Sequence, residues 1–183
     1  IVQFPFIGVL AYVVTKLIAG EDETVKYEPL YLDKILIHQA PSLALGNAKK
    51  ELLHMGGYAF KSFELAYDYI INHEEKAAEK GHKTEEAINA IDDELTRYLI
   101  TLSGEQLSQK ESEILTNILD SSRDLERIGD HSEALINLTD YLLRKKVTFS
   151  PAALEELEKI YHMTLEFIKE ALTSVETNDV ELA

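Results

Sequence analysis

Apolar positions recur at helical spacing from Ser42 almost to the end of the chain. In residues 42–80 they follow one stripe at intervals of three or four residues, which predicts an amphipathic helix. The stripe contains Leu45, Ala48, Leu52, Met55, Ala59, Ser62 and Ala66. We expect this helix to fade between Asn72 and Lys80 and to stop at Gly81, because glycine is common just beyond helix ends.

Two further helices are predicted to complete a bundle. The stripe of the second helix is Ile88, Ile91, Leu95, Tyr98 and Leu102. The third helix opens with a capping box, Ser108-x-x-Glu111, and only Gly129 interrupts it. Its predicted core positions are Ile114, Ile118, Ser121, Leu125, Ile128, Ser132, Leu135 and Leu142. Residues 42–147 are therefore predicted to form an all-α, three-helix bundle.

A fourth helix is predicted after Ser150-Pro151, a helix cap followed by proline at the first helical position. Its apolar stripe is Leu154, Leu157, Tyr161, Leu165, Ile168, Leu172 and Val175. No remaining sequence could cover this stripe, so we expect its side chains to be exposed.

The first residues differ from the rest of the chain. In residues 1–19 only Gln3, Thr15 and Lys16 interrupt an apolar run. A bilayer is crossed by about 20 apolar residues, so this stretch is interpreted as the end of a transmembrane helix that begins upstream. The alternative is a buried N-terminal helix of a soluble protein. Residues 20–41 are expected to form a short tether.

The net charge limits the classes of partner. A formal charge of −15 argues against nucleic-acid binding and against docking on an anionic membrane surface. Much of this acidity is explained by solubility alone. The absence of cysteine excludes disulfides and thiolate metal ligands.

Two carboxylates on the third helix are candidates for chemistry. Glu126 and Asp130 are four residues apart and so share one helix face. Gly129 lies between them, and glycine within a helix costs about 1 kcal/mol relative to alanine. We therefore expect another helix or a bound ion to approach closely there. The neighbouring His131 is expected to be a surface histidine.

The string DLERIGDH at residues 124–131 resembles the signature of PhoU-like domains, which are bundles of three-helix repeats associated with bacterial phosphate homeostasis. Residues 27–56 resemble the junction after the last membrane helix of bacterial Na⁺/phosphate cotransporter family proteins. The match is carried by Tyr31, Leu32, Asp33, Pro41, Leu43, Ala44, Leu45, Ala48 and Glu51. The resemblance implies a first PhoU-like repeat at residues 42–147 and the first helix of a second, truncated repeat at residues 148–183.

The same resemblance implies a metal site. In PhoU-like families, paired acidic motifs on neighbouring helices can hold multinuclear metal clusters. Carried over to this chain, the ligands are Glu126 and Asp130 with Glu85 and Asn89. Oxygen ligands suit Mg²⁺, Mn²⁺ or iron better than copper or zinc. Asn89 is neutral and therefore a weaker ligand than a carboxylate.

Two alternatives compete with the metal site. Glu126 could instead form surface ion pairs, which are worth only about 0–1 kcal/mol. Its candidate partners are Arg97, Arg123 and Arg127. A di-iron enzyme would need Glu-x-x-His on two helices, and Glu51 with His54 is the candidate pair considered for it. No phosphate-binding glycine loop or cysteine nucleophile is present, so we do not expect an enzyme.

The resemblance implies the cytoplasmic regulatory region of a Na⁺-coupled phosphate transporter in the bacterial inner membrane. Its partner would be its own membrane transport domain, which would lie upstream and handle Na⁺ and phosphate. The alternative is a free-standing PhoU-like, metal-binding regulator of phosphate uptake. A third hypothesis is a purely structural bundle that mediates oligomerisation, and a homo-oligomer is compatible with each of these roles.

Overall fold

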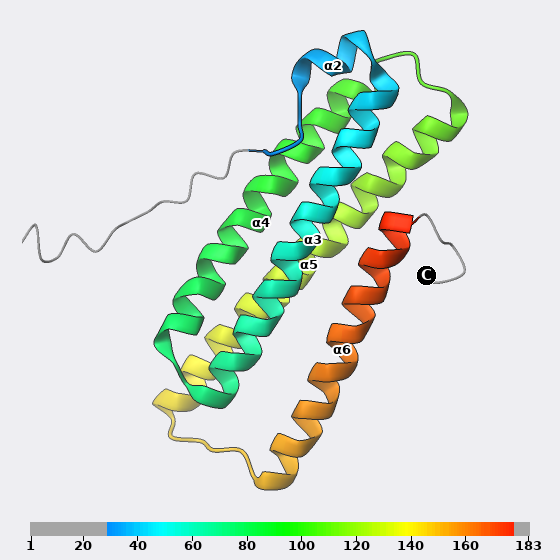
Figure 1. The fold of residues 1–183 in the computed structure, drawn as a ribbon. Coiled ribbons are helices and arrows are strands. Elements are labelled where there is room, and N and C mark those ends of the chain that lie inside the picture. Colours follow the sequence, from blue (N-terminus) through cyan, green and yellow to red (C-terminus); the bar gives the residue numbers. More distant parts are fainter. Residues whose placement is uncertain (1–28, 178–183) are drawn as a thin grey trace, which may run out of the picture.

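The computed structural model describes residues 29–177, and every regular element in this range is an α-helix. In chain order these are α2 (Lys34–Gln39), α3 (Pro41–Asn72), α4 (Glu75–Leu102), α5 (Gln109–Arg144) and α6 (Pro151–Thr177) (Figure 1). The predicted all-α class is confirmed. Within the described range, no helix combines the length and apolar character needed to cross a bilayer. The predicted transmembrane segment, residues 1–19, lies outside the described residues.

Helices α3, α4 and α5 form an antiparallel three-helix bundle in which each helix packs on the other two (Figure 1). Short loops after α3 and α4 make each helix reverse direction against its predecessor. The largest fully buried apolar side chains belong to Leu52, Met55, Ile88, Ile91, Leu95, Leu99, Leu102 and Ile136. Leu125 is also buried as predicted, whereas Ile128 is only half-buried and packs at the edge of the core.

The boundary between α3 and α4 differs from the prediction. Helix α3 ends at Asn72, where His73 adopts a left-handed conformation with φ of 57°, and α4 begins at Glu75. Gly81 is therefore no helix stop, because it lies inside α4. It is buried there, and a β-carbon at this position would collide with the Ile136 side chain of α5. The glycine permits a close contact between helices.

The core stripe of α5 is partly displaced by one residue from the predicted one. Ile118, Leu125 and Ser132 are buried as expected. The remaining buried positions of α5 are Leu115, Ser122, Gly129, Ile136 and Thr139. Helix α5 packs on both α3 and α4, so its buried face points between these two helices. Several residues of that face are small, namely Ser122, Gly129 and Ser132.

The region expected to be a tether contains a packed helix. Asp33 accepts a hydrogen bond from the Ile35 backbone N–H at 2.9 Å and so caps α2. Ile37 of this helix is 2% exposed and joins the main core. Pro41 then opens α3 at its first turn. Residues 34–39 are thus part of the folded domain, while residues 20–28 lie outside the described part of the chain.

Helix α6 lies against α3 (Figure 1). Ser150 caps it by accepting from the Ala153 N–H at 3.2 Å, which confirms the predicted start at Ser150-Pro151. The Tyr161 ring stacks on Tyr67 of α3, with ring centroids 3.7 Å apart. The predicted exposure of the apolar stripe is therefore wrong for most of its length: Ile168 is buried and most other members are half-buried. The exposed ridge of α6 is instead Ile160, Met163 and Phe167.

Candidate acidic site between α4 and α5

Polar side chains follow neighbouring faces of α4 and α5. On α4 they are His82, Glu85, Asn89 and Asp92, and on α5 they are Glu126, Asp130 and Glu133. Spacings of three and four residues keep each set on one helix face. The two faces meet, because His82 Nδ1 lies 2.9 Å from Glu133 Oε1. We call these seven residues the acidic groove.

Glu85 is the most buried member of the acidic groove, with 9% of its surface exposed. The Asn89 side-chain amide donates a hydrogen bond to its Oε1 atom. Burial raises the pKa of Glu85, and the negative charges of Glu133 and Asp130 raise it further, while the hydrogen bond from Asn89 partly opposes them. Two of the four predicted site residues, Glu85 and Asn89, are thus in direct contact.

The pKa of Glu126, on α5, is also raised. Burial raises its pKa first, followed by the negative charges of Asp130 and Asp92, whereas Arg127 lowers it. Asp130 is exposed, and its charge acts on both Glu85 and Glu126. The structure therefore couples all three predicted carboxylates electrostatically.

The arginines considered as partners of Glu126 have other contacts. Arg97 pairs with Glu94 at 3.1 Å and with Asp93 at 3.8 Å. Arg123 pairs with Asp120 at 3.7 Å. Of these three arginines, only the adjacent Arg127 lowers the pKa of Glu126.

Gly129 marks the close approach of α4 and α5. It is buried, and a β-carbon built on it would lie 3.0 Å from Ile88 Cδ1 of α4. The close neighbour of Gly129 is therefore the opposite helix. His131, two residues further along, is exposed, as expected for a surface histidine.

The donor atoms of the acidic groove suit a hard cation, because they are carboxylate and amide oxygens. Across residues 29–177, however, no three histidine, aspartate or glutamate side chains are gathered closely enough to hold a metal ion. A metal bound to Glu85, Asn89, Glu126 and Asp130 would therefore require side-chain rearrangement. Metal ligation stays a prediction.

Three members of the acidic groove were not predicted from the sequence. His82 lies three residues before Glu85, Asp92 lies three residues after Asn89, and Glu133 lies three residues after Asp130. Asp92 also accepts a hydrogen bond from the buried Ser122 hydroxyl of α5. Extending the helical spacing of the motif in both directions would have found all three.

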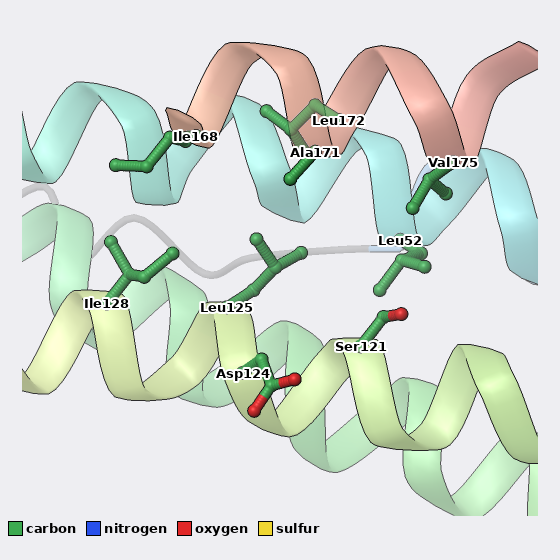
Figure 2. A pocket seen from close by; sticks show the side chains of 9 residues that line it. All are labelled: Leu52, Ser121, Asp124, Leu125, Ile128, Ile168, Ala171, Leu172 and Val175. Carbon is green, nitrogen blue, oxygen red and sulfur yellow. The ribbon is translucent and has the colours of Figure 1, made fainter. Parts of the chain in front are cut away.

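A second feature near α5 is apolar. A cavity of about 150 Å³ lies between α3, α5 and α6, and Figure 2 shows the side chains that line it. Most are aliphatic, and Ser121 and Asp124 supply the only side-chain oxygens of the lining. This lining offers contacts for apolar groups but no set of ligands or reacting groups. The acidic groove is therefore the better candidate for chemistry.

Comparison with known proteins finds similarity to one domain family and to a group of curated relatives. Residues 52–139 match the family model described as PhoU domain, a range that includes the whole acidic groove. The chain is 27% identical over 185 residues to the "Putative inorganic phosphate export protein YjbB" of Escherichia coli (strain K12), covering 100% of this chain and 34% of that protein.

The protein of the same name from Salmonella typhimurium is 25% identical over 181 residues, which cover 98% of this chain and 33% of that protein. The chain thus spans about a third of the length of the curated relatives it matches. No solved structure matches the chain.

Proposed function

We propose that this chain, which carries a PhoU-like domain of a phosphate transporter family, is the cytoplasmic regulatory region of a Na⁺-coupled phosphate transporter. A role in the regulation of phosphate transport is supported by the PhoU match together with the similarity to phosphate export proteins. The observation that carries the proposal is that this similarity extends over the whole chain, including residues outside the PhoU match. The partner would be a membrane domain of the same polypeptide, in the bacterial inner membrane.

The acidic groove is the proposed regulatory site. Burial, and then the charges of neighbouring carboxylates, raise the pKa values of Glu85 and Glu126. A bound divalent cation, Mg²⁺, Mn²⁺ or Fe²⁺, would supply compensating positive charge. Glu85, Glu126 and Asp130 would hold it, with Asn89 as a neutral ligand. Because Gly129 and Ile88 are in close contact, a change at the groove would alter the packing of α4 on α5.

Regulation requires only a modest energetic connection to the transport domain. A coupling free energy of about 1–3 kcal/mol between two sites changes binding affinity by roughly 5- to 150-fold. The same region could also assemble with a second copy of itself, and oligomerisation would not conflict with this role.

Phosphate flux in cells tests the proposal. The complete reading frame containing this chain would be expressed with and without residues 42–147, and uptake and efflux of radiolabelled phosphate would be measured with Na⁺ present or replaced by K⁺. We expect Na⁺-dependent flux in both proteins, with a changed rate after deletion. Membrane levels of both proteins would be compared as a control. Equal flux per molecule would contradict a regulatory role.

The alternative, a free-standing PhoU-like regulator that binds metal, is favoured by the PhoU match taken alone. The complete reading frame distinguishes the two proposals. Several apolar segments of membrane length before residue 1 would support the transporter, whereas their absence from the reading frame would support the free-standing regulator.

Metal binding has its own test. A thermal melt of the chain would be recorded with and without Mn²⁺, Mg²⁺ or Fe²⁺, beside the variant Asp130→Asn. Ligand at a hundredfold excess over Kd stabilises the folded state by about 2.7 kcal/mol. We expect this stabilisation in the parent chain and a smaller one in the variant. No shift in the parent, or equal shifts in both, would assign the motif to helix packing.

A further inference from the structure

A buried glutamate joins the start of the described chain to the bundle. The Glu51 side chain on α3 is 0% exposed, and its Oε2 atom accepts a hydrogen bond from the backbone N–H of Tyr31 at 2.7 Å. The two residues are 20 positions apart in the sequence. Glu51 therefore fixes the position of a segment that precedes α2.

A second attachment holds the same segment to another helix. The Tyr98 hydroxyl of α4 donates a hydrogen bond to the backbone carbonyl of Asp33 at 3.0 Å. Asp33 also caps α2, and Ile37 of α2 is buried in the core. Residues 31–37, which we call the α2 junction, thus contact both α3 and α4. Of these two helices, α4 also contributes His82, Glu85, Asn89 and Asp92 to the acidic groove.

His54 also lies beside the Glu51 carboxylate. Its Nδ1 atom lies 3.0 Å from Glu51 Oε1, one turn further along α3. The rings of Tyr31 and Tyr58 meet the His54 ring edge-on, with centroids 6.3 and 5.1 Å away. Both carboxylate oxygens of Glu51 therefore have polar partners, as a buried polar group requires.

Stability alone does not explain a carboxylate at this position. Replacing buried charged groups by well-packed apolar residues is often neutral or stabilising, whereas a specific hydrogen-bonded geometry needs the polar group. At Glu51 the carboxylate accepts the hydrogen bond from the Tyr31 backbone N–H of the α2 junction. Tyr31, Asp33, Pro41 and Glu51 all belong to the sequence resemblance described above. In the structure Asp33 caps α2 and Pro41 starts α3. Tyr31 and Glu51 form the hydrogen bond that attaches the segment before α2 to α3.

We propose that Glu51 is a positioning residue that locks the α2 junction onto α3, so that changes in the packing of the bundle are transmitted to the chain before residue 29. This inference rests on the proposed regulatory function, because transmission matters only if a partner domain lies upstream. A flexible connection would lose the signal, whereas a junction attached to α3 and α4 moves with them.

Hydrogen exchange of the 183-residue chain tests the attachment. The variants are Glu51→Ala, which removes the acceptor, and Glu51→Gln, whose amide oxygen can still accept from Tyr31. Because loss of a local contact increases local opening, we expect the Tyr31 and Asp33 amides to exchange about tenfold faster in E51A. In E51Q they should stay near the parent rate, and the amides of α5 should be unchanged in both variants. Unchanged exchange at Tyr31 in E51A would overturn the proposal.

Two further variants keep the test decisive. Glu64→Ala, also on α3, is the matched control and should leave the α2 junction unaffected. Tyr98→Phe removes only the hydroxyl that binds the Asp33 carbonyl, so it tests the junction even if E51A fails to fold. Faster exchange at residues 31–37 in Y98F is expected, and unchanged exchange there would contradict the proposed attachment.

Phosphate flux of the complete protein separates this inference from the proposed function. If deletion of residues 42–147 changes flux, we expect E51A to reproduce that change and E51Q to retain the parent behaviour. A deletion effect combined with parent-like flux in E51A would overturn the role of Glu51 and leave the regulatory function intact. Absence of any deletion effect would refute the regulatory function itself, and the transmission role with it, while the exchange rates would still decide whether Glu51 attaches the junction.

Discussion

At the scale of single residues, the unusual feature is a carboxylate that is buried beside other carboxylates. Glu85 has a raised pKa because burial and the charges of Glu133 and Asp130 disfavour its ionised form. The folded protein therefore binds this proton more tightly than the unfolded chain does. Its contribution to stability is present at low pH and is lost as the pH rises through the folded-state pKa, above the ordinary value of 4.5.

The variant Glu85→Gln tests whether ionised Glu85 lowers the stability of the folded protein. Glutamine keeps an acceptor for Asn89 and removes the charge, so we expect a higher melting temperature than the parent at pH 7. The difference should close by about pH 4, where the parent glutamate is protonated. Glu166→Gln, at an exposed position on α6, is the control and should show no such pH dependence. A constant difference across the pH range would show that charge is not the cause.

Gly129 provides a second test at this scale. Glycine to alanine in an exposed helix interior stabilises by about 0.5–1 kcal/mol, and Gly57 has open space around its α-carbon. At Gly129 the new methyl group would press on Ile88. We expect Gly57→Ala to raise the free energy of unfolding by that amount. Gly129→Ala should raise it by less, and Gly129→Val should lower it. Urea denaturation measures all three, and equal gains for the two alanine variants would refute a tight α4–α5 contact.

At the scale of helices, periodicity and caps predicted most of the fold. The Ser108-x-x-Glu111 box and Ser150-Pro151 mark helix starts because the side chains satisfy backbone groups of the same turn, a local interaction. Gly81 was misread because glycine marks both helix ends and close contacts, and only the packing of Ile136 distinguishes them. Helix α2 has only six residues, too short for a period to be recognised.

The start of α5 should depend on its cap. The Glu111 carboxylate accepts from the Ser108 hydroxyl, the Ser42 hydroxyl and the Ser108 backbone N–H, which together lower its pKa to about 2. Removing a serine cap typically costs about 1 kcal/mol, so Ser108→Ala should lower the free energy of unfolding by about that amount at pH 7.

The contribution of Glu111 is present above its unfolded-state pKa and is lost as the pH falls toward 2. The cost of Ser108→Ala, measured by urea denaturation, should therefore shrink in acid. Ser112→Ala, within the first turn of the same helix, controls for the substitution itself. If the cost of Ser108→Ala did not change with pH, the proposed link between the Ser108 cap and the Glu111 carboxylate would be contradicted.

At the scale of the whole molecule, the acidic groove was only partly predictable. The shared face of Glu126 and Asp130 follows from helical spacing alone. That α4 supplies Glu85 and Asn89 opposite them depends on how the helices pack, and only the family resemblance indicated it. His82 and Glu133 continue the same helical spacing, but their contact across the two helices follows only from the packing.

Phosphate flux through the complete protein, reconstituted in vesicles, tests the central claim most directly. The parent would be compared with the double variant Glu126→Gln and Asp130→Asn, and with the control Asp120→Asn, which lies outside the acidic groove on α5. We predict that the double variant changes the flux rate or its dependence on added Mn²⁺, whereas the control behaves as the parent does. Identical flux in all three proteins, with and without Mn²⁺, would contradict the claim that this groove regulates phosphate transport.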